Sequence, residues 1–346
     1  MKSAWKKFLI DQGAEFEEER LVSFGNPNRE RRIAPQGAVL SNLADRGLLE
    51  VTGADAESFL QNQLTNDITK IDASTHQLTA WCNPKGRVIA NFRAFKRGES
   101  IYLIMSRDMV ETVMTKLSRY IMMSKVTIED ATDSLVHFGY AGENAQLDLE
   151  MILDKVPTEP NETLNLGQLT ILRLPGNTPR FEVFGDITEA SNLWVKCNVR
   201  AAPVSSQAWD YMNILAGRPV VTAETTEAWI PQMLNLTDID AVDFKKGCYP
   251  GQEVVARLKY LGKNKRRMFN VEIATHQVPK VNDEIVLEDG TEAGKILNAV
   301  INPDDNVQAL VILKIADSEK PLFLSQGDAK VAVKVLSLPY ATDDES

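Results

Sequence analysis

The sequence predicts an α+β protein with antiparallel sheets and a small C-terminal β-barrel. Two patterns support this fold class. Before Arg267, strand–helix–strand units recur, which is typical of split α+β domains. After Arg267, short strands alternate with Gly- and Asp-containing turns, which is typical of a small antiparallel barrel. The length of 346 residues is more than one core usually supports and favours two or three domains.

The first residues are charged and predict a short helix followed by a loose arm. Residues 39–51 mix apolar and polar side chains and predict one or two edge strands. A helix follows at 55–64, because Asp55 can cap its first turn and apolar side chains recur at a spacing of three to four residues.

Apolar runs separated by turn residues predict the remaining elements. The predicted strands are 77–82, 88–95, 100–105, 126–128, 135–140, 169–174, 181–184, 268–273, 284–287, 292–297, 309–315 and 329–335. The predicted helices are 108–119, 144–153, 187–195 and 207–216. The expected domains are an N-terminal arm at 1–37, a central α+β unit at 38–130 and 205–262 that carries Cys248, a second α+β unit at 131–204, and a barrel at 263–346 that ends in a disordered acidic tail at 340–346.

Composition argues against two classes of protein. The net charge of −10 does not suit broad non-specific nucleic-acid binding, which depends on neutralising phosphates. No apolar run approaches the roughly 20 residues that a membrane span needs, and the apolar core near the start is too short for a signal peptide. We therefore expect a cytoplasmic protein that does not contact a membrane.

Cys82, Cys197 and Cys248 are too few and too far apart for a disulfide framework or a paired-cysteine metal site. An iron–sulfur cluster usually takes four thiolates, so we expect no metal held by this chain alone, while a cluster shared with a partner stays open. Cys82 lies in a predicted strand and Cys197 at a predicted helix end, and both are interpreted as structural.

The segment Lys245-Lys246-Gly247-Cys248-Tyr249-Pro250-Gly251-Gln252-Glu253 has the most distinctive chemistry. The thiolate is the reactive form of cysteine, and the two lysines or Arg257 could favour it by their positive charge. Residues 249–252 predict a type II β-turn, because proline presets φ at the second position and glycine tolerates positive φ at the third. Cys248 is therefore expected at the mouth of a fixed turn, and the alternative is a buried structural cysteine.

The longer run Phe244-Lys245-Lys246-Gly247-Cys248-Tyr249-Pro250-Gly251-Gln252-Glu253-Val254-Val255-Ala256-Arg257, with Ile230-Pro231-Gln232 and Asn235-Leu236 before it, resembles the signature of the YgfZ family. These are folate-binding, tRNA-modification-linked relatives of the glycine-cleavage T-protein, an aminomethyltransferase. Weaker likenesses extend the match over roughly residues 40–340. The resemblance implies an aminomethyltransferase-like folate-binding fold, with tetrahydrofolate or a one-carbon derivative as cofactor.

The resemblance also implies that the transferase reaction is lost. T-proteins carry a pattern like Asn-x-x-Gly-Gly-Val-Ile-Asp-Asp, and the corresponding run here is 83–91. Ala90 and Asn91 occupy the two acidic positions, and neither can act as an anionic base or stabilise a cationic iminium. We therefore expect folate binding without that chemistry, and a folate-dependent one-carbon transferase that uses Cys248 as nucleophile is the alternative.

Five positions are the expected folate contacts. Trp209 aligns with a tryptophan that contacts folate in YgfZ relatives, and Arg46 falls where a second such tryptophan would lie; arginine can also stack on an aromatic plane. Glu182 lies where T-proteins carry a glutamate and could hydrogen-bond a pterin amino group. Tyr249 and Gln252 complete the set. On the residues alone, Trp209 could instead be a core residue and Glu182 an exposed strand residue.

The YgfZ family supports iron–sulfur proteins, including the radical enzymes that methylthiolate tRNA. The resemblance therefore implies Cys248 as the reactive residue, with Lys246 lowering the pKa of its thiol, and a tRNA methylthiotransferase as the kind of partner. A lone thiolate could hold a sulfur, an iron or a folate-derived carbon unit, and the sequence does not choose among them.

A basic segment follows the motif directly. Its members are Arg257, Lys259, Lys263, Lys265, Arg266 and Arg267. It is either a solvated linker or hairpin face, or a docking surface for an anionic partner such as a polyglutamated folate tail or RNA. A pure scaffold function would leave Cys248→Ala silent and make the protein sensitive to charge reversal at Arg266 and Arg267.

Overall fold

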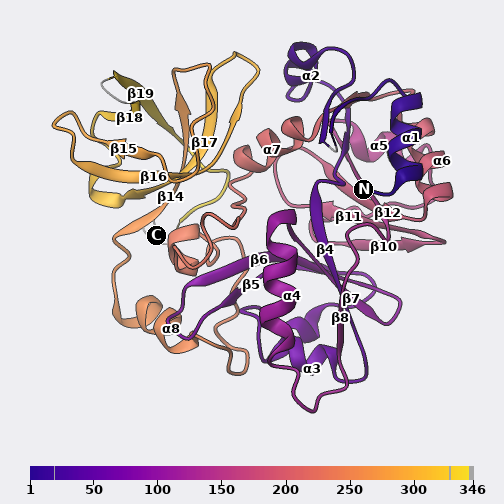
Figure 1. The fold of residues 1–346 in the computed structure, drawn as a ribbon, viewed down its shortest axis with the longest axis horizontal. Helices are drawn as coiled ribbons and strands as arrows, with labels where there is room; N and C mark the ends of the chain where they lie inside the picture. The colour runs from indigo at the N-terminus through magenta and orange to yellow at the C-terminus, as the bar shows by residue number, and fades with distance from the viewer. Residues whose placement is uncertain (19, 327–328, 343–346) are drawn as a thin grey trace. The chain divides into compact units, whose positions relative to one another are not determined.

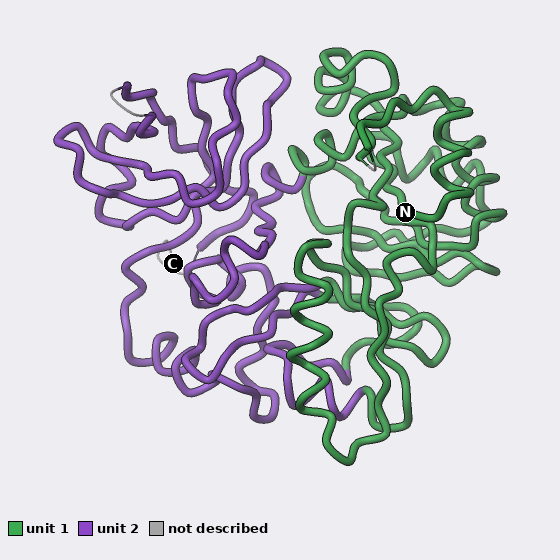
Figure 2. Tube along the Cα trace, viewed as in Figure 1, with its two compact units in different colours: residues 1–56, 70–77, 93–212 green, residues 57–69, 78–92, 213–346 purple. Residues whose placement is uncertain are grey.

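The computed structural model describes residues 1–18, 20–326 and 329–342, and Figure 1 shows its helices and strands. These residues form two compact units that are built from interleaved segments of the chain (Figure 2). Unit 1 comprises residues 1–56, 70–77 and 93–212, and unit 2 comprises residues 57–69, 78–92 and 213–346. Within the described ranges, no helix is long and apolar enough to cross a membrane.

The α-helices are short and agree with the predicted positions, with two additions. They are α1 (Ser3–Asp11), α2 (Pro27–Ile33), α3 (Ala56–Gln61), α4 (Val110–Ser118), α5 (Ala145–Glu150), α6 (Ile187–Cys197), α7 (Ser206–Leu215) and α8 (Gln252–Leu261). The sequence did not predict α2 or α8, nor the 3₁₀ turns η1 (Ile68–Lys70), η3 (Pro231–Leu234) and η4 (Ile315–Asp317). Asp186 caps α6 by accepting hydrogen bonds from the backbone N–H groups of Thr188 and Glu189, which explains its well-defined start.

Unit 1 contains a six-stranded sheet with the order β10-β11-β12-β9-β3-β13. Its strands are β3 (Val39–Asn42), β9 (Val136–Ala141), β10 (Thr163–Leu166), β11 (Leu169–Leu174), β12 (Arg180–Gly185) and β13 (Ala202–Val204). The pairs from β10 through to β3 are antiparallel, and β13 pairs with β3 in parallel. The sequence predicted β9, β11 and β12; β10 and β13 are too short to give a clear alternation.

Alternation along β9 and β12 gives this sheet two different faces, because successive side chains of a strand point to opposite sides. Phe138 and Phe181 pack on one side in a core shared with α1, α5 and α6. Phe184 packs on the other side in a core shared with α7, whose Trp209 is fully buried. Gly139 of β9 leaves the room for that indole, since a Cβ at Gly139 would lie 2.5 Å from a ring carbon of Trp209.

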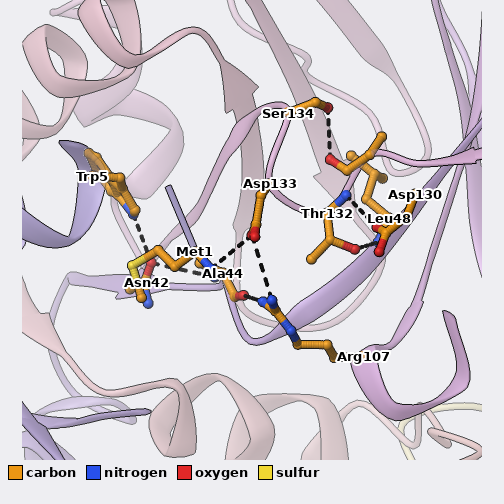
Figure 3. A network of polar contacts seen from close by, with 11 residues as sticks. Met1, Trp5, Asn42, Ala44, Leu48, Arg107, Asp130, Thr132, Asp133 and Ser134 are labelled. Atoms are coloured by element: carbon orange, nitrogen blue, oxygen red, sulfur yellow. Dashed lines mark hydrogen bonds and ion pairs between the residues drawn. The ribbon is translucent and has the colours of Figure 1, made fainter. Parts of the chain in front are cut away.

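The N-terminal residues are not the loose arm that the sequence predicted. After α1, the short strands β1 (Glu15–Glu17) and β2 (Arg20–Ser23) pair antiparallel, and α2 follows. Figure 3 shows how the start of the chain is fastened: the amino group of Met1 lies 2.8 Å from the carboxylate of Asp133, and Trp5 Nε1 donates to Asn42 Oδ1 at 2.9 Å. Trp5 is also 1% exposed, so burial of its ring anchors the arm on unit 1.

A five-stranded sheet has the order β5-β6-β7-β4-β8. Its strands are β4 (Arg46–Thr52), β5 (His76–Cys82), β6 (Val88–Arg97), β7 (Ser100–Ser106) and β8 (Thr127–Asp130). All five were predicted, β4 as part of the segment 39–51 and the others within two residues of their ends. The boundary between the units falls within β5 and within β6.

The C-terminal part of unit 2 is the predicted small barrel, closed in the order β14-β17-β16-β15-β18-β19. Its strands are β14 (Arg266–Ile273), β15 (Glu284–Val286), β16 (Glu292–Ile301), β17 (Val307–Lys314), β18 (Leu322–Gln326) and β19 (Ala329–Leu336). Alternate residues such as Val271, Val311 and Leu324 fill its interior. Only β18 was missed by the sequence. The predicted disorder of the tail concerns mostly residues 343–346, which lie outside the described residues.

The close packing of Gly139 against Trp209 leads to a prediction on stability. Gly139→Ala forces a methyl group into the indole, so we expect unit 1 to lose about 1–3 kcal/mol of unfolding free energy. Urea denaturation measures this loss. Gly247→Ala is the matched control, because a Cβ there meets no described atom within 4 Å, and it should change stability by only a few tenths of a kcal/mol. Equal stability of the two variants would contradict the packing described.

Candidate functional site

The cysteine motif forms the predicted type II β-turn. Gly251 has φ 83° and ψ 0°, the values that the third position of this turn requires, and the N–H of Gln252 donates to the carbonyl of Tyr249 at 3.2 Å. The turn leads straight into α8, which begins at Gln252. Cys248 therefore lies immediately before a turn of fixed geometry, as predicted.

The turn is pressed against a second turn of unit 2. A Cβ at Gly251 would lie 2.5 Å from the carbonyl oxygen of Asn83 and 2.7 Å from the Cα of Gly86. The second turn is itself rigid, because Asn83 Oδ1 accepts from the N–H groups of Lys85 and Arg87, and Gly86 has φ 71°. Glycine is thus required on both sides of this contact, by positive φ and by space.

Lys246 holds the loop from the other side. Its Nζ donates to the backbone carbonyls of Gln61 at 2.6 Å and Leu64 at 2.5 Å, which lie at and just after the end of α3. Burial lowers the pKa of Lys246 to about 8, although Asp67 and Asp243 raise it again in part. The ammonium also lies 5.4 Å from the centre of the Tyr249 ring. Lys246 therefore ties the motif to the α3 segment, as cations near a helix C-terminus do.

The three cysteines differ sharply in their surroundings. Cys248 is exposed, so the alternative of a buried structural cysteine is wrong. Cys82 and Cys197 are buried, and burial raises the pKa of each thiol to about 12, which keeps both protonated at neutral pH. Cys82 lies at the end of β5 and Cys197 at the end of α6, which agrees with their structural interpretation.

Tyr249 and Gln252 lie beside the cysteine with different exposure. Tyr249 is 6% exposed, and its hydroxyl has no hydrogen-bond partner in the part of the chain that the structure describes. Burial and the nearby Cys82 raise the pKa of Tyr249, so the phenol stays neutral. Gln252 is the first residue of α8 and is partly exposed.

The basic segment after the motif spans the end of α8, a short connection and the start of β14, so it is not a single linker or hairpin. Arg257 and Lys259 lie on α8, Lys263 lies in the connection, and Arg266 opens β14 beside Glu292, with a nitrogen–oxygen distance of 3.3 Å. Arg257, Lys259 and Lys263 are exposed.

A second group of polar residues lies on the α7 face of the six-stranded sheet in unit 1. His137 and Glu182 come from β9 and β12, where Glu182 pairs with Gly139, and alternation places all three on the Trp209 side. His137 Nε2 lies 3.3 Å from Glu182 Oε2, and the His137 ring stacks on Phe184 with centroids 4.1 Å apart.

Glu182 is buried, with 8% of its surface exposed, so the alternative of an exposed strand residue is wrong. Burial alone would raise the pKa of Glu182, but the neighbouring His137, together with Arg93 and Arg46, lowers it to about 2. The carboxylate is therefore ionised at neutral pH and can only accept hydrogen bonds.

Arg46 lies beside this carboxylate and forms an ion pair with Asp210, the residue after Trp209. Burial opposes the charge of Arg46, but Asp210, Asp45 and Glu182 together raise its pKa. Burial raises the pKa of Asp210, and Arg46 lowers it. Because 37% of the Asp210 side chain is exposed, water also stabilises its carboxylate, and the two side chains form an ion pair. Arg46 thus connects β4 to α7.

Trp209 lies in the core between Gly139 and Arg180, whose guanidinium carbon is 5.8 Å from the ring centre. It is fully buried, which agrees with the core-residue alternative. Its Nε1 has no hydrogen-bond partner among the described residues, which is unusual for a buried indole.

The predicted site residues thus form two groups. Arg46, Glu182 and Trp209 come together in unit 1, and Lys246, Cys248, Tyr249 and Gln252 come together in unit 2. Sequence reasoning missed His137 and Asp210. His137 alternates with apolar residues along a predicted strand, and Asp210 directly follows Trp209. Neither position indicates by itself that His137 contacts Glu182 or that Asp210 pairs with Arg46.

The charge on Glu182 leads to a pH-dependent prediction. A carboxylate whose pKa falls from 4.5 to about 2 on folding stabilises the protein fully above pH 4.5 and loses this effect as the pH falls towards 2. We expect Glu182→Gln to cost about 1–3 kcal/mol at neutral pH, and the difference from wild type to shrink below pH 4.5. Thermal unfolding across pH tests this, with the exposed Glu99→Gln as control. A difference independent of pH would contradict the assignment.

Comparisons with known proteins agree with the architecture. Residues 9–173 match the GCVT N-terminal domain. The structure is similar to the aminomethyltransferase T of the glycine cleavage system from Bartonella henselae, with a TM-score of 0.80, covering 97% of this chain and 96% of that chain at 17% identity. At that identity the likeness establishes the aminomethyltransferase-like fold.

Two relatives are more similar in sequence. The tRNA-modifying protein YgfZ of Escherichia coli O7:K1 is 33% identical over 308 residues, which is 88% of this chain and 94% of that protein. The tRNA-modifying protein YgfZ of Shigella boydii serotype 4 matches with the same identity and coverage. Because this identity extends over nearly the whole length of both proteins and includes both units, the chain belongs to the YgfZ family.

Proposed function

We propose that this protein binds tetrahydrofolate or a one-carbon derivative and assists iron–sulfur-dependent tRNA modification, with Cys248 as its reactive residue. The observation that carries the proposal is the 33% identity to tRNA-modifying proteins over 308 residues. The partner in this proposal is an iron–sulfur enzyme such as a tRNA methylthiotransferase, and the place of action is the cytoplasm.

The geometry around Cys248 supports a reactive thiol. Cys248 is exposed, whereas Cys82 and Cys197 are buried and held as neutral thiols. The loop around Cys248 is held by the Gly251 turn on one side and by the two hydrogen bonds of Lys246 on the other. In this proposal Lys246 positions the loop that carries Cys248, through its hydrogen bonds to the Gln61 and Leu64 carbonyls.

The polar group in unit 1 supports the folate part. A pterin ring presents N–H groups along one edge, and the ionised carboxylate of Glu182 is an acceptor suited to them. Arg46 supplies a cation and a flat guanidinium beside it, and Trp209 Nε1 is a buried donor without a partner among the described residues. In the proposal Trp209 contributes this donor and the wall of the site, because its ring lies in the core.

The one-carbon transferase remains the second candidate because the fold matches an aminomethyltransferase. The acidic side chains that the transferase reaction would use are missing at positions 90 and 91, where T-proteins carry them. Ala90 is fully buried, and the Asn91 amide is engaged in structure: Nδ2 donates to the Pro219 carbonyl at 2.8 Å and Oδ1 accepts from the N–H of Val221 at 2.9 Å. These contacts favour the non-transferase proposal.

The tRNA role predicts a modification defect in cells. Nucleoside mass spectrometry of tRNA should show less methylthiolated adenosine when the gene is deleted, and the wild-type gene should restore it. Cys248→Ser should restore none, because a hydroxyl cannot replace a thiolate as nucleophile or metal ligand. Lys246→Ala should restore little, whereas Lys245→Ala, at an exposed neighbour without those hydrogen bonds, should restore fully. An unchanged modification level in the deletion strain would refute this role.

The folate role predicts direct binding by the purified protein. Calorimetric titration with tetrahydrofolate should give an affinity that falls roughly tenfold or more in Glu182→Gln and in Arg46→Ala, since each removes a charge-assisted contact. Glu99→Gln is the control and should bind like wild type. If all variants bind equally, folate does not use this group of residues. Turnover of methylene-tetrahydrofolate by the wild type would instead support the transferase.

A further inference from the structure

A polar cavity of unit 2 lies at the end of α8, outside the cysteine motif. Its volume is about 780 Å³, and it is lined from α8, from the connection to β14, and from η3 with the loop after it. None of its lining residues belongs to the groups assigned above to folate or to the reactive thiol. A cavity of this size accommodates a nucleotide-sized ligand.

Three cationic side chains line this cavity. Lys259 comes from α8, Lys263 from the connection and Arg267 from β14, while Asp238 adds a carboxylate. Two of the cations are held in place: Lys259 Nζ lies 5.9 Å from the centre of the Phe244 ring, and the Arg267 guanidinium lies 4.3 Å from that of Phe269. Cations that converge on a cavity from three different segments suit a phosphate group.

The side-chain oxygens of two amides in the cavity wall receive no hydrogen bond from the described residues. Gln232 is 7% exposed, and its Nε2 donates to the Val255 carbonyl at 2.7 Å. Asn264 Nδ2 donates to the Gln232 carbonyl at 3.3 Å. Because a carbonyl can only accept, these contacts fix both amide orientations and leave Gln232 Oε1 and Asn264 Oδ1 as acceptors, and neither has a partner within residues 1–18, 20–326 and 329–342. A ligand that supplies hydroxyl or amino hydrogens would satisfy them.

We propose that this cavity binds a ribonucleotide unit of an RNA strand. The phosphate lies against Lys259, Lys263 and Arg267, and the 2′-hydroxyl or a base amino group donates to the oxygens of Gln232 and Asn264. The 2′-hydroxyl distinguishes RNA from DNA, so the amide oxygens favour RNA. This inference rests on the proposed role in tRNA modification and names the surface that would contact the RNA.

The charges around the cavity favour a strand over a free nucleotide. The exposed Lys265 lies two residues from both Lys263 and Arg267 and adds a further cation to this segment. Each further phosphate contact adds affinity through counterion release.

The experiment is a fluorescence-anisotropy titration of the full-length protein with a labelled single-stranded RNA of about 12 nucleotides and with DNA of the same sequence. We expect the RNA to bind more tightly than the DNA. The double variant Lys259→Ala, Lys263→Ala should weaken RNA binding roughly tenfold or more and reduce the slope of log affinity against log salt by about 2.

The matched control is Lys280→Ala, Lys334→Ala, which removes two exposed lysines that do not line the cavity. It should leave RNA affinity within about twofold. Asn264→Ala should narrow the difference between RNA and DNA, because it removes an acceptor for the 2′-hydroxyl. Equal weakening by both lysine pairs, equal affinity of wild type for RNA and DNA, or full competition by free AMP at the strand's own concentration would each overturn the proposal.

The same variants separate this inference from the proposed function. If Lys259→Ala, Lys263→Ala binds RNA normally while deletion of the gene still lowers tRNA methylthiolation, the function stands and the RNA site is wrong. If the double variant loses RNA binding while deletion leaves tRNA methylthiolation unchanged, the RNA site stands and the modification role is wrong.

Discussion

The contact between Gly86 and Gly251 governs the geometry of the cysteine loop. Each glycine has a positive φ, and each would place a Cβ against the backbone or side chain of the opposing turn. The two turns can approach this closely only because both lack side chains there. The turn at Gly251 then sets where α8 begins, and α8 in turn presents Lys259 to the cavity beside the barrel. A local backbone constraint therefore positions two separate groups of functional candidates.

Unit 1 contains charged side chains that are buried between its sheet and α7. Glu182 is buried but lies beside His137 and within electrostatic reach of Arg46, and Arg46 in turn pairs with Asp210 at its more exposed end. Buried charges are tolerated when they are paired in this way. These contacts run from β9 and β12 through β4 to α7. A ligand that changed the charge of one of these residues would therefore shift the electrostatic potential at the others.

Much of this architecture follows from the sequence, because its signals are local. The barrel, the type II turn and the strands β5 to β7 were predicted from alternation and turn residues. The first helix was predicted, but the loose arm expected after it was wrong, since the order of this region comes from burial of Trp5 against distant segments. Helix α8 was missed because it has no apolar stripe packed on a core, and Val255 is its only buried residue. The pairings of Glu182 with His137 and of Arg46 with Asp210 depend on strand register and tertiary contact, which no local pattern encodes.

The contrast among the three thiols has a practical consequence. Because Cys82 and Cys197 are buried, a maleimide reagent applied to the folded protein finds a single accessible thiol, that of Cys248. The wild-type chain is therefore already a single-label protein, and a fluorophore or spin probe attached there reports on the motif loop without any engineered cysteine. Cys82 and Cys197 become reactive only on unfolding, so a folded molecule takes up one label and an unfolded molecule takes up three.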